Sequence, residues 1–220
     1  MAKIILFFLG PPGSGKGTQI NLLSQKTGWK KISIGDLLRA EVVLKSKLGK
    51  QVEKLQKTGN LVPDKLLINL VSKSLNQKTN GLIFDGYPRD MGQLRSLLNI
   101  FKKYLKKNDQ ALTLLITIND KEVKQRLSQR RMCACGAVYH LKYNPPINKN
   151  ICDICSKKLF IRNDDKLKVV EHRLKVYYKN IKPVLDYWQK IGKLIKINGE
   201  QNINKIHKDI SAKLKELKLI

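Results

Sequence analysis

Short apolar runs recur along the chain, and longer stretches with helical spacing separate them. The first run, KIILFFL at residues 3–9, is apolar after its lysine and shows no alternation with polar residues. Such a run is typical of a strand buried on both faces of a parallel sheet. Comparable runs lie at 30–33, 82–85, 112–118 and 193–197. The pattern predicts an α/β fold with a parallel five-stranded sheet flanked by helices.

The segments between these runs carry the spacing of amphipathic helices. Helices are predicted at 18–26, 64–76 and 91–105, together with a long helix from residue 166 that Pro183 should kink or end. A final apolar stripe predicts a closing amphipathic helix from residue 202 onward. The stripe consists of Ile203, Ile206, Ile210, Leu214 and Leu217.

Two stretches interrupt the alternation of strands and helices. Residues 33–62 have helical spacing and no strand, and residues 129–165 have no long apolar period. Both are expected as insertions at the ligand-binding edge of the sheet, the second as a small β-rich lid. The core domain would then comprise residues 1–32, 63–128 and 166–220.

The charges are strongly unbalanced, because 44 Lys and Arg stand against 17 Asp and Glu, a formal net charge of +27. Such a surplus suits a polyanionic partner: a nucleotide, a nucleic acid or an anionic membrane. A coding bias toward lysine, with no partner at all, is the alternative. Arginine is more informative, because it binds phosphate bidentately and lysine does not. The arginines are Arg39, Arg89, Arg95, Arg126, Arg130, Arg131, Arg162 and Arg173.

A glycine-rich loop follows the first predicted strand. It reads GPPGSGKGT from Gly10 to Thr18 and precedes a predicted helix. Glycines allow several backbone N–H groups to converge on phosphate oxygens, and the helix N-terminus adds positive potential. Lys16 can reach the β- and γ-phosphates, but Gly17 stands where the general pattern has Ser or Thr. The loop therefore predicts a phosphate site that differs from the generic nucleoside-triphosphatase version.

Together with this loop, four further motifs resemble the adenylate kinase family of nucleoside monophosphate kinases. The resemblance covers almost the whole chain in the family's order, with Tyr87 where the family usually has Phe. The further motifs are ISIGDLLR at 32–39, NLVPD at 60–64, FDGYPRDMGQ at 84–93, and the lid sequences QRRMCACGAVYHLKYNPP and IRNDD…EHRL.

This resemblance implies reversible phosphoryl transfer, ATP + AMP = 2 ADP, directly and in line between two bound nucleotides. The acceptor is already an anion, so fixed cations matter and a general base does not. The insert at 33–62 would bind AMP. The residues implied in catalysis are Lys16, Arg89, Arg130, Arg162 and Arg173.

The resemblance also implies two nucleotide sites. The ATP residues would be Gly13, Ser14, Gly15, Lys16, Gly17, Thr18, Arg126, Arg130, Val138, Tyr139 and Gln201. The AMP residues would be Ile34, Arg39, Asn60, Leu61, Val62, Gly86, Tyr87, Pro88, Arg89, Gln93, Arg162 and Arg173.

Two of these positions bear on base selection. The amide of Gln93 can accept from the adenine N6 amino group and donate to N1, which favours AMP over CMP or UMP. Ile34 stands where the family commonly has Thr, so one hydroxyl is missing near the acceptor base. Such a hydrogen bond contributes about 0.5–1.5 kcal/mol, so a modest effect on AMP selectivity is expected.

Other charged residues leave alternatives open. Asp85 ends an apolar run and would hold Mg²⁺ through water, or it caps a helix or turn. Asp164 and Asp165 would pair with arginines and hold the lid shut, or they are solvated. Arg126 lies one turn before Arg130, which would place both on one helix face. Arg95 and Arg131 have no implied role and are expected at the surface.

All four cysteines lie in the lid, as C-x-C and C-x-x-C pairs separated by 16 residues. Four thiolates at such spacing suit structural Zn²⁺, although the metal-bearing branch of the family usually has C-x-x-C in the first pair. His140 or Asp153 would be substitute ligands, and a metal-free, reducible set is the alternative. The candidate ligands are Cys133, Cys135, Cys152 and Cys155.

The remaining expectations concern partners and location. The expected partners are ATP and AMP or ADP. The protein is expected to be a monomer that binds neither membranes nor a specific nucleic acid. The apolar start IILFFL is too short for a membrane span, so a cytoplasmic location is expected. Another nucleoside monophosphate kinase with relaxed acceptor choice is the nearest alternative. A P-loop, zinc-knuckle protein that binds nucleic acid is a remote one.

Overall fold

The structure is a computed structural model that describes residues 2–58, 62, 64–75 and 78–220. A five-stranded sheet forms its centre in the order β2-β3-β1-β4-β7, and every pairing within it is parallel. The predicted sheet is thereby confirmed. Its strands are β1 (Ile4–Leu9), β2 (Lys30–Ser33), β3 (Gly81–Asp85), β4 (Gln110–Thr117) and β7 (Leu194–Asn198).

The apolar run of β1 becomes the middle strand because both of its faces are covered. Successive side chains of a strand point to opposite faces. Leu6 and Phe8 accordingly pack into one core cluster and Phe7 into the other. Phe7 stacks on Phe84 of β3 with ring centroids 5.2 Å apart, and Trp188 covers it at 5.5 Å. The carboxyl end of β1 is therefore rigidly supported.

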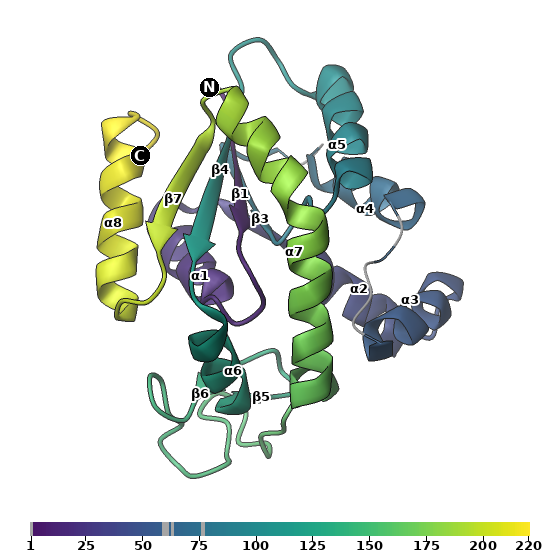
Figure 1. Ribbon diagram of the computed structural model, residues 1–220, viewed down its shortest axis with the longest axis vertical. Coiled ribbons are helices and arrows are strands. Elements are labelled where there is room, and N and C mark those ends of the chain that lie inside the picture. Colours follow the sequence, from purple (N-terminus) through teal and green to yellow (C-terminus); the bar gives the residue numbers. More distant parts are fainter. Residues whose placement is uncertain (1, 59–61, 63, 76–77) are drawn as a thin grey trace.

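Helices cover both faces of this sheet (Figure 1). On one face lie α1 (Lys16–Thr27) and α8 (Ile203–Glu216); on the other lie α4 (Asp64–Leu75), α5 (Met91–Tyr104) and α7 (Leu167–Lys190). Within α8, the side chains of Ile206, Ile210 and Leu214 are buried, as the stripe predicts, whereas Leu217 follows the last helical residue and is exposed. Among the described helices, none has both the length and the apolar character that a membrane span requires.

Of the two alternatives expected at Pro183, a kink in the long helix or its end, the end is wrong. Helix α7 runs for 24 residues with Pro183 inside it. Proline removes the hydrogen bond to the carbonyl four residues earlier, here Lys179. Both Pro183 and Lys179 are exposed, so water can bind that carbonyl, while Ile181, Val184 and Trp188 hold the other side of the helix in the core.

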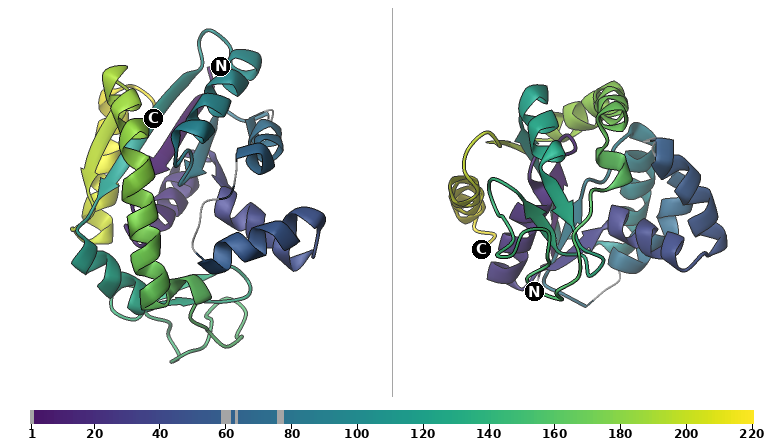
Figure 2. Two further views of the ribbon diagram at one scale, coloured as in Figure 1. Left: turned by 45° about the vertical axis from the view of Figure 1, so that its right-hand side comes forward. Right: turned by 90° about the horizontal axis from the view of Figure 1, so that it is seen from below.

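The two interrupting stretches extend from this core (Figure 2). The first contains the helices α2 (Ile34–Val43) and α3 (Lys47–Thr58), which contact each other, and the described residues of this stretch after Ser33, the end of β2, form no strand. The second follows α6 (Asp120–Ser128) and contains the antiparallel pair β5 (Arg130–Met132) and β6 (Val138–His140), then the short 3₁₀ helix η1 (Asn163–Asp165). The predicted domain boundaries at 33–62 and 129–165 enclose these elements.

Candidate active site

A cavity of about 1260 Å³ lies where the glycine-rich loop, α2, α6, α7 and the segment 129–165 meet. A site for one small molecule usually measures about 300–1,000 Å³, so this cavity has room for more than one such ligand. Most of the predicted ATP residues line it, Ser14 being the exception because it is fully buried. Of the described AMP residues, those that line it are Arg39, Gly86, Arg89, Arg162 and Arg173.

The glycine-rich loop has a shape that only glycine permits at two positions. Gly10 and Gly13 have φ angles of 147° and 79°. A Cβ on Gly10 would lie 2.6 Å from the carbonyl oxygen of Ile116, and one on Gly13 would lie 2.8 Å from Cγ of Leu127. Helix α1 starts within the loop, at Lys16, so its unpaired N–H groups face the cavity.

Lys16 folds against this loop. Its Nζ donates to the carbonyl oxygens of Gly10 and Pro11 at 2.8 and 2.9 Å, and to Ser14 Oγ at 3.3 Å. Burial, opposed by Asp85 and assisted by nearby arginines, lowers the pKa of Lys16 to about 7. The neutral amine of Lys16 can thus gain a proton when phosphate arrives.

We therefore expect ATP binding at pH 8 to take up close to one proton. A pKa of about 7 leaves Lys16 mostly neutral at that pH, and an adjacent phosphate anion raises the pKa and favours the charged form. Calorimetric titrations in buffers of different ionisation enthalpy measure this uptake. Lys16→Arg, which stays charged, should show almost none. Equal uptake by both proteins would contradict the expectation.

Six of the eight arginines line the cavity. The other two do not: Arg95 is exposed on α5, and Arg131 donates to the carbonyl oxygens of Ser128 and Arg130. The scarce guanidinium groups are thus concentrated where planar anions would be bound. The six are Arg39, Arg89, Arg126, Arg130, Arg162 and Arg173.

Asp164 and Asp165 pair with three of these arginines. Arg130 binds Asp165 in bidentate fashion, at 2.8 Å from Nε and 2.5 Å from Nη2, and the Asp165 side chain is fully buried. Arg162 binds Asp164 with the same geometry, and Arg173 lies 3.2 Å from Asp164 Oδ2. Burial raises the pKa of Asp164, but Arg173 and Arg162 outweigh it and hold this pKa below its ordinary value. The predicted ion pairs are confirmed.

Two further arginines, Arg39 and Arg89, line the cavity from α2 and from the segment after β3. Arg39 on α2 pairs with Asp36, one turn earlier, and Ser33 caps that helix by accepting from the Asp36 N–H. Arg89 donates from Nε to the Gly86 carbonyl at 2.5 Å. These contacts leave guanidinium N–H groups of both side chains available to an anion.

Gln93 is almost fully buried and does not line the cavity. Its Oε1 accepts from the Arg89 N–H at 2.8 Å, and its Nε2 donates to the Val62 carbonyl at 3.4 Å. One lone pair and one N–H of the amide remain for a base edge. Ile34 and Tyr87 are likewise buried, in the core cluster below the cavity, and Pro88 is buried outside its lining. Asn60 and Leu61 lie outside the described residues.

The predicted ATP-base residues come from three elements. Arg126 projects from α6, Val138 and Tyr139 lie on β6, and Gln201 follows β7. The expectation that Arg126 and Arg130 share a helix face is wrong, because α6 ends at Ser128 and Arg130 begins β5. Both side chains nevertheless reach the same cavity.

Asp85 lines the cavity at the carboxyl end of β3. Its Oδ2 would lie 3.9 Å from a Cβ on Gly17, so the carboxylate adjoins the start of α1. Carboxylate oxygens are the protein ligands that Mg²⁺ prefers, and Mg²⁺ keeps several waters. The donor type and position fit a water-bridged ion.

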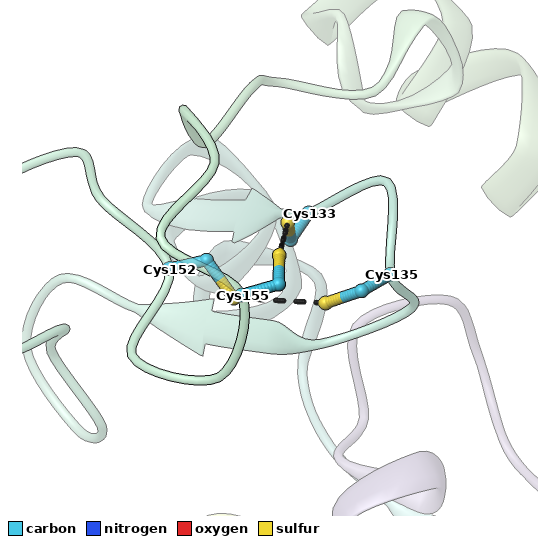
Figure 3. Close-up of side chains that lie close together, drawn as sticks. All are labelled: Cys133, Cys135, Cys152 and Cys155. Atoms are coloured by element: carbon cyan, nitrogen blue, oxygen red, sulfur yellow. Dashed lines mark hydrogen bonds between the residues drawn. The ribbon is translucent and has the colours of Figure 1, made fainter.

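The four cysteines form one cluster (Figure 3). Their Sγ atoms all lie within 4.8 Å of one another, with Cys133 and Cys155 at 3.3 Å and Cys135 and Cys152 at 3.6 Å. Zn–S bonds of about 2.3 Å in a tetrahedron separate sulfurs by about 3.8 Å, so the set fits one ion. Donation from the Tyr139 hydroxyl lowers the pKa of Cys152 to about 6, which favours the thiolate.

The substitute ligands considered from the sequence are not part of this cluster. His140 Nδ1 accepts from the N–H groups of Lys142 and Tyr143, and Asp153 Oδ1 accepts from the Ile147 N–H. Among the described residues, the four cysteines form the cluster of three or more His, Cys, Asp or Glu side chains whose ligand atoms are close enough to hold one metal ion.

Sequence reasoning overlooked Tyr143 and Glu122, which contact Arg126 at the cavity. The ring of Tyr143 lies 5.6 Å from the Arg126 guanidinium carbon, and Glu122 binds its Nε. The i,i+4 spacing of Glu122 and Arg126 was a usable signal for their pair. The contact with Tyr143 joins residues 17 positions apart in different elements, which no local pattern indicates.

Comparisons with known proteins agree with this geometry. The family model described as adenylate kinase matches residues 8–193. The chain is 41% identical over 216 residues to an adenylate kinase of Archaeoglobus fulgidus, covering 97% of this chain and 99% of the relative. It is 42% identical over 211 residues to one of Methanothrix thermoacetophila, covering 95% and 97%, and 40% identical over 210 residues to one of Bacillus cytotoxicus, covering 94% and 96%.

Proposed function

Because the chain belongs to the adenylate kinase family, we propose that it catalyses the reversible reaction ATP + AMP = 2 ADP. The observation that carries the proposal is the cavity itself, which joins a phosphate-binding loop to six arginines. Two nucleotides carry several negative charges, so fixed cations are what direct transfer between them requires.

In this proposal the glycine-rich loop binds the ATP phosphates. Backbone N–H groups of Gly13 to Thr18 surround the β-phosphate, and Lys16 moves from the loop carbonyls to the phosphate oxygens. Arg126 and Gln201 lie at the edge of the adenine site, and Val138 and Tyr139 of β6 cover it. Ser14 supports the loop from beneath, because its side chain is fully buried.

AMP occupies the opposite half of the cavity. Arg39 and Arg89 bind its phosphate, and Gln93 reads the adenine edge with its remaining donor and acceptor. Val62, whose carbonyl accepts from Gln93, aligns that amide. Ile34, Tyr87 and Pro88 act indirectly, since they are buried below the site.

Arg130, Arg162 and Arg173 act on the transferring phosphoryl group. They exchange part of their bonding from Asp164 and Asp165 to phosphate oxygens, and the charge that spreads over those oxygens is stabilised. No general base is required, because the attacking oxygen of AMP is already ionised. Closure of the lid, residues 129–165, over ATP excludes water, so transfer to AMP prevails over hydrolysis.

Two metal ions complete the proposal. Asp85 would hold, through water, the Mg²⁺ that accompanies ATP, and that ion would neutralise phosphate charge. Zn²⁺ bound by the four cysteines is structural: it stabilises a lid whose core cluster is small. The buried residues of that cluster are Cys133, Tyr139, Cys152 and Leu159.

An acceptor panel tests the reaction. ATP-dependent nucleoside diphosphate formation is measured with AMP, GMP, CMP and UMP at equal concentration. We expect clear preference for AMP, because the amide of Gln93 complements adenine. A stronger response to another acceptor would overturn the substrate assignment, and no transfer to any of the four would overturn the reaction.

We further propose that the protein works as a monomer in the cytoplasm. Clustered thiols that bind metal persist in a reducing compartment, where they stay reduced. Sedimentation at micromolar concentration tests the oligomeric state.

A further inference from the structure

Arg126 is held by groups from three separate parts of the chain. On α6 its Nε donates to Glu122 Oε1 at 2.8 Å, and from the other side its Nη2 donates to the Gly199 carbonyl, after β7, at 2.9 Å. The third contact is the ring of Tyr143, from the segment after β6, 5.6 Å from the guanidinium carbon. The Arg126 side chain is only 13% exposed. These three contacts fix the plane of the Arg126 guanidinium group.

Tyr143 is itself fixed on both sides. Its hydroxyl donates to Glu122 Oε1 at 3.2 Å, the oxygen that Arg126 also uses. Its backbone N–H donates to His140 Nδ1, and its ring lies 4.6 Å from the His140 ring. Glu122 therefore joins Arg126 on the core side to Tyr143 on the lid side through one carboxylate oxygen.

We propose that Tyr143 and Glu122 are positioning residues that orient the Arg126 guanidinium plane toward the ATP base. The inference rests on the proposed function. A planar cation stacks on a base only when the two planes are aligned, and a preset plane lowers the entropy lost on binding. Because Tyr143 belongs to the lid and Glu122 to the core, lid closure and alignment of Arg126 occur together.

Tyr143→Phe tests the hydroxyl contact while keeping the ring. Loss of one such hydrogen bond is expected to weaken ATP binding about two- to tenfold, in both the dissociation constant and the KM for ATP. The KM for AMP should change less than twofold. The preference for ATP over GTP as donor should fall, an outcome that general loosening of the fold would not produce. An unchanged ATP dissociation constant would overturn the inference.

Glu122→Ala, and the variant that combines it with Tyr143→Phe, complete a double-mutant cycle. Since Tyr143 and Arg126 share one carboxylate oxygen, the double variant should be no weaker for ATP than Glu122→Ala alone. If the two substitutions weaken ATP binding additively, Glu122 and Tyr143 do not act together. Tyr104→Phe, a tyrosine on α5 outside the cavity, is the matched control, and thermal unfolding checks each fold. Absence of AMP phosphorylation in the parent would overturn the proposed function, whereas the ATP dissociation constants still test this inference.

Discussion

Replacing Arg89 with methionine is expected to lower turnover by about 10³-fold or more, the scale at which arginines act on transferring phosphoryl groups. The side chain is exposed to the cavity, and its Nε is anchored on the Gly86 carbonyl. Removing it therefore deletes a fixed cation without opening a hole in the core. The decrease should appear in kcat/KM for AMP, with ATP binding nearly unchanged.

The control is Arg95→Met. Arg95 lies on the exposed face of α5, outside the cavity, so this change removes the same charge from the protein without touching the site. A coupled assay for ADP formation measures turnover, and thermal unfolding compares stability. If Arg89→Met retains turnover within tenfold of the parent, the proposed role of Arg89 is wrong. Arg89→Lys should recover only part of the activity, because lysine cannot bind phosphate bidentately.

Changing both Cys152 and Cys155 to serine is expected to release the metal and to lower turnover by about 10²-fold. Binding energy of structural zinc is largely folding energy, and a misplacement of about 1 Å at a phosphoryl-transfer site costs about 10²-fold. Cys152 is 1% exposed at the centre of the small lid cluster, and Arg130 starts the strand that leads into it. An unfolded lid would no longer hold Arg130 at the cavity.

Metal analysis should find one zinc per chain in the parent and almost none in this double variant. Ala134→Ser is the control, since it adds a hydroxyl in the turn between Cys133 and Cys135 but removes no sulfur ligand. Parent protein without metal, or a double variant with turnover within twofold of the parent, would overturn the structural role. Circular dichroism of the two proteins reports whether loss of structure extends beyond the lid.

The sheet and its glycine-rich loop were predictable because each signal is local. A run such as IILFFL can be buried on both faces only in a central parallel strand, and GPPGSGKGT directly follows it. The arginines of the cavity were found for a different reason. They are scarce in a lysine-rich chain, so their positions within motifs carry information that the net charge of +27 does not.

Errors arose where neighbouring elements decide the outcome. The sequence around Arg126 and Arg130 has helical spacing, but α6 ends at Ser128, and β5 then pairs with β6. Pro183 carries a strong helix-ending signal, which the buried side of α7 overrides. In both cases tertiary contacts outweigh a local preference.

Hydrogen bonds between a site side chain and main-chain groups could not be predicted either. Gln93 was expected to face a base, but the groups that orient its amide, the Arg89 N–H and the Val62 carbonyl, could not be foreseen. A sequence lists side chains but does not say which main-chain groups fold back onto them. Tyr143 was missed for a different reason, because the side chain of its partner Glu122 lies 21 residues away on another element.

The order β2-β3-β1-β4-β7 places the glycine-rich loop at the middle of the sheet. Asp85 ends the strand on one side of β1 and Arg89 follows it, whereas Arg126 and Gln201 follow strands on the other side. Under the proposed assignment, the residues that recognise the donor base follow strands on the β4 and β7 side of β1, whereas Gln93, which reads the acceptor base, follows β3 on the other side. Substitutions on the β4 and β7 side can accordingly alter the choice of phosphoryl donor while the choice of acceptor stays as it is, so the two specificities can diverge independently.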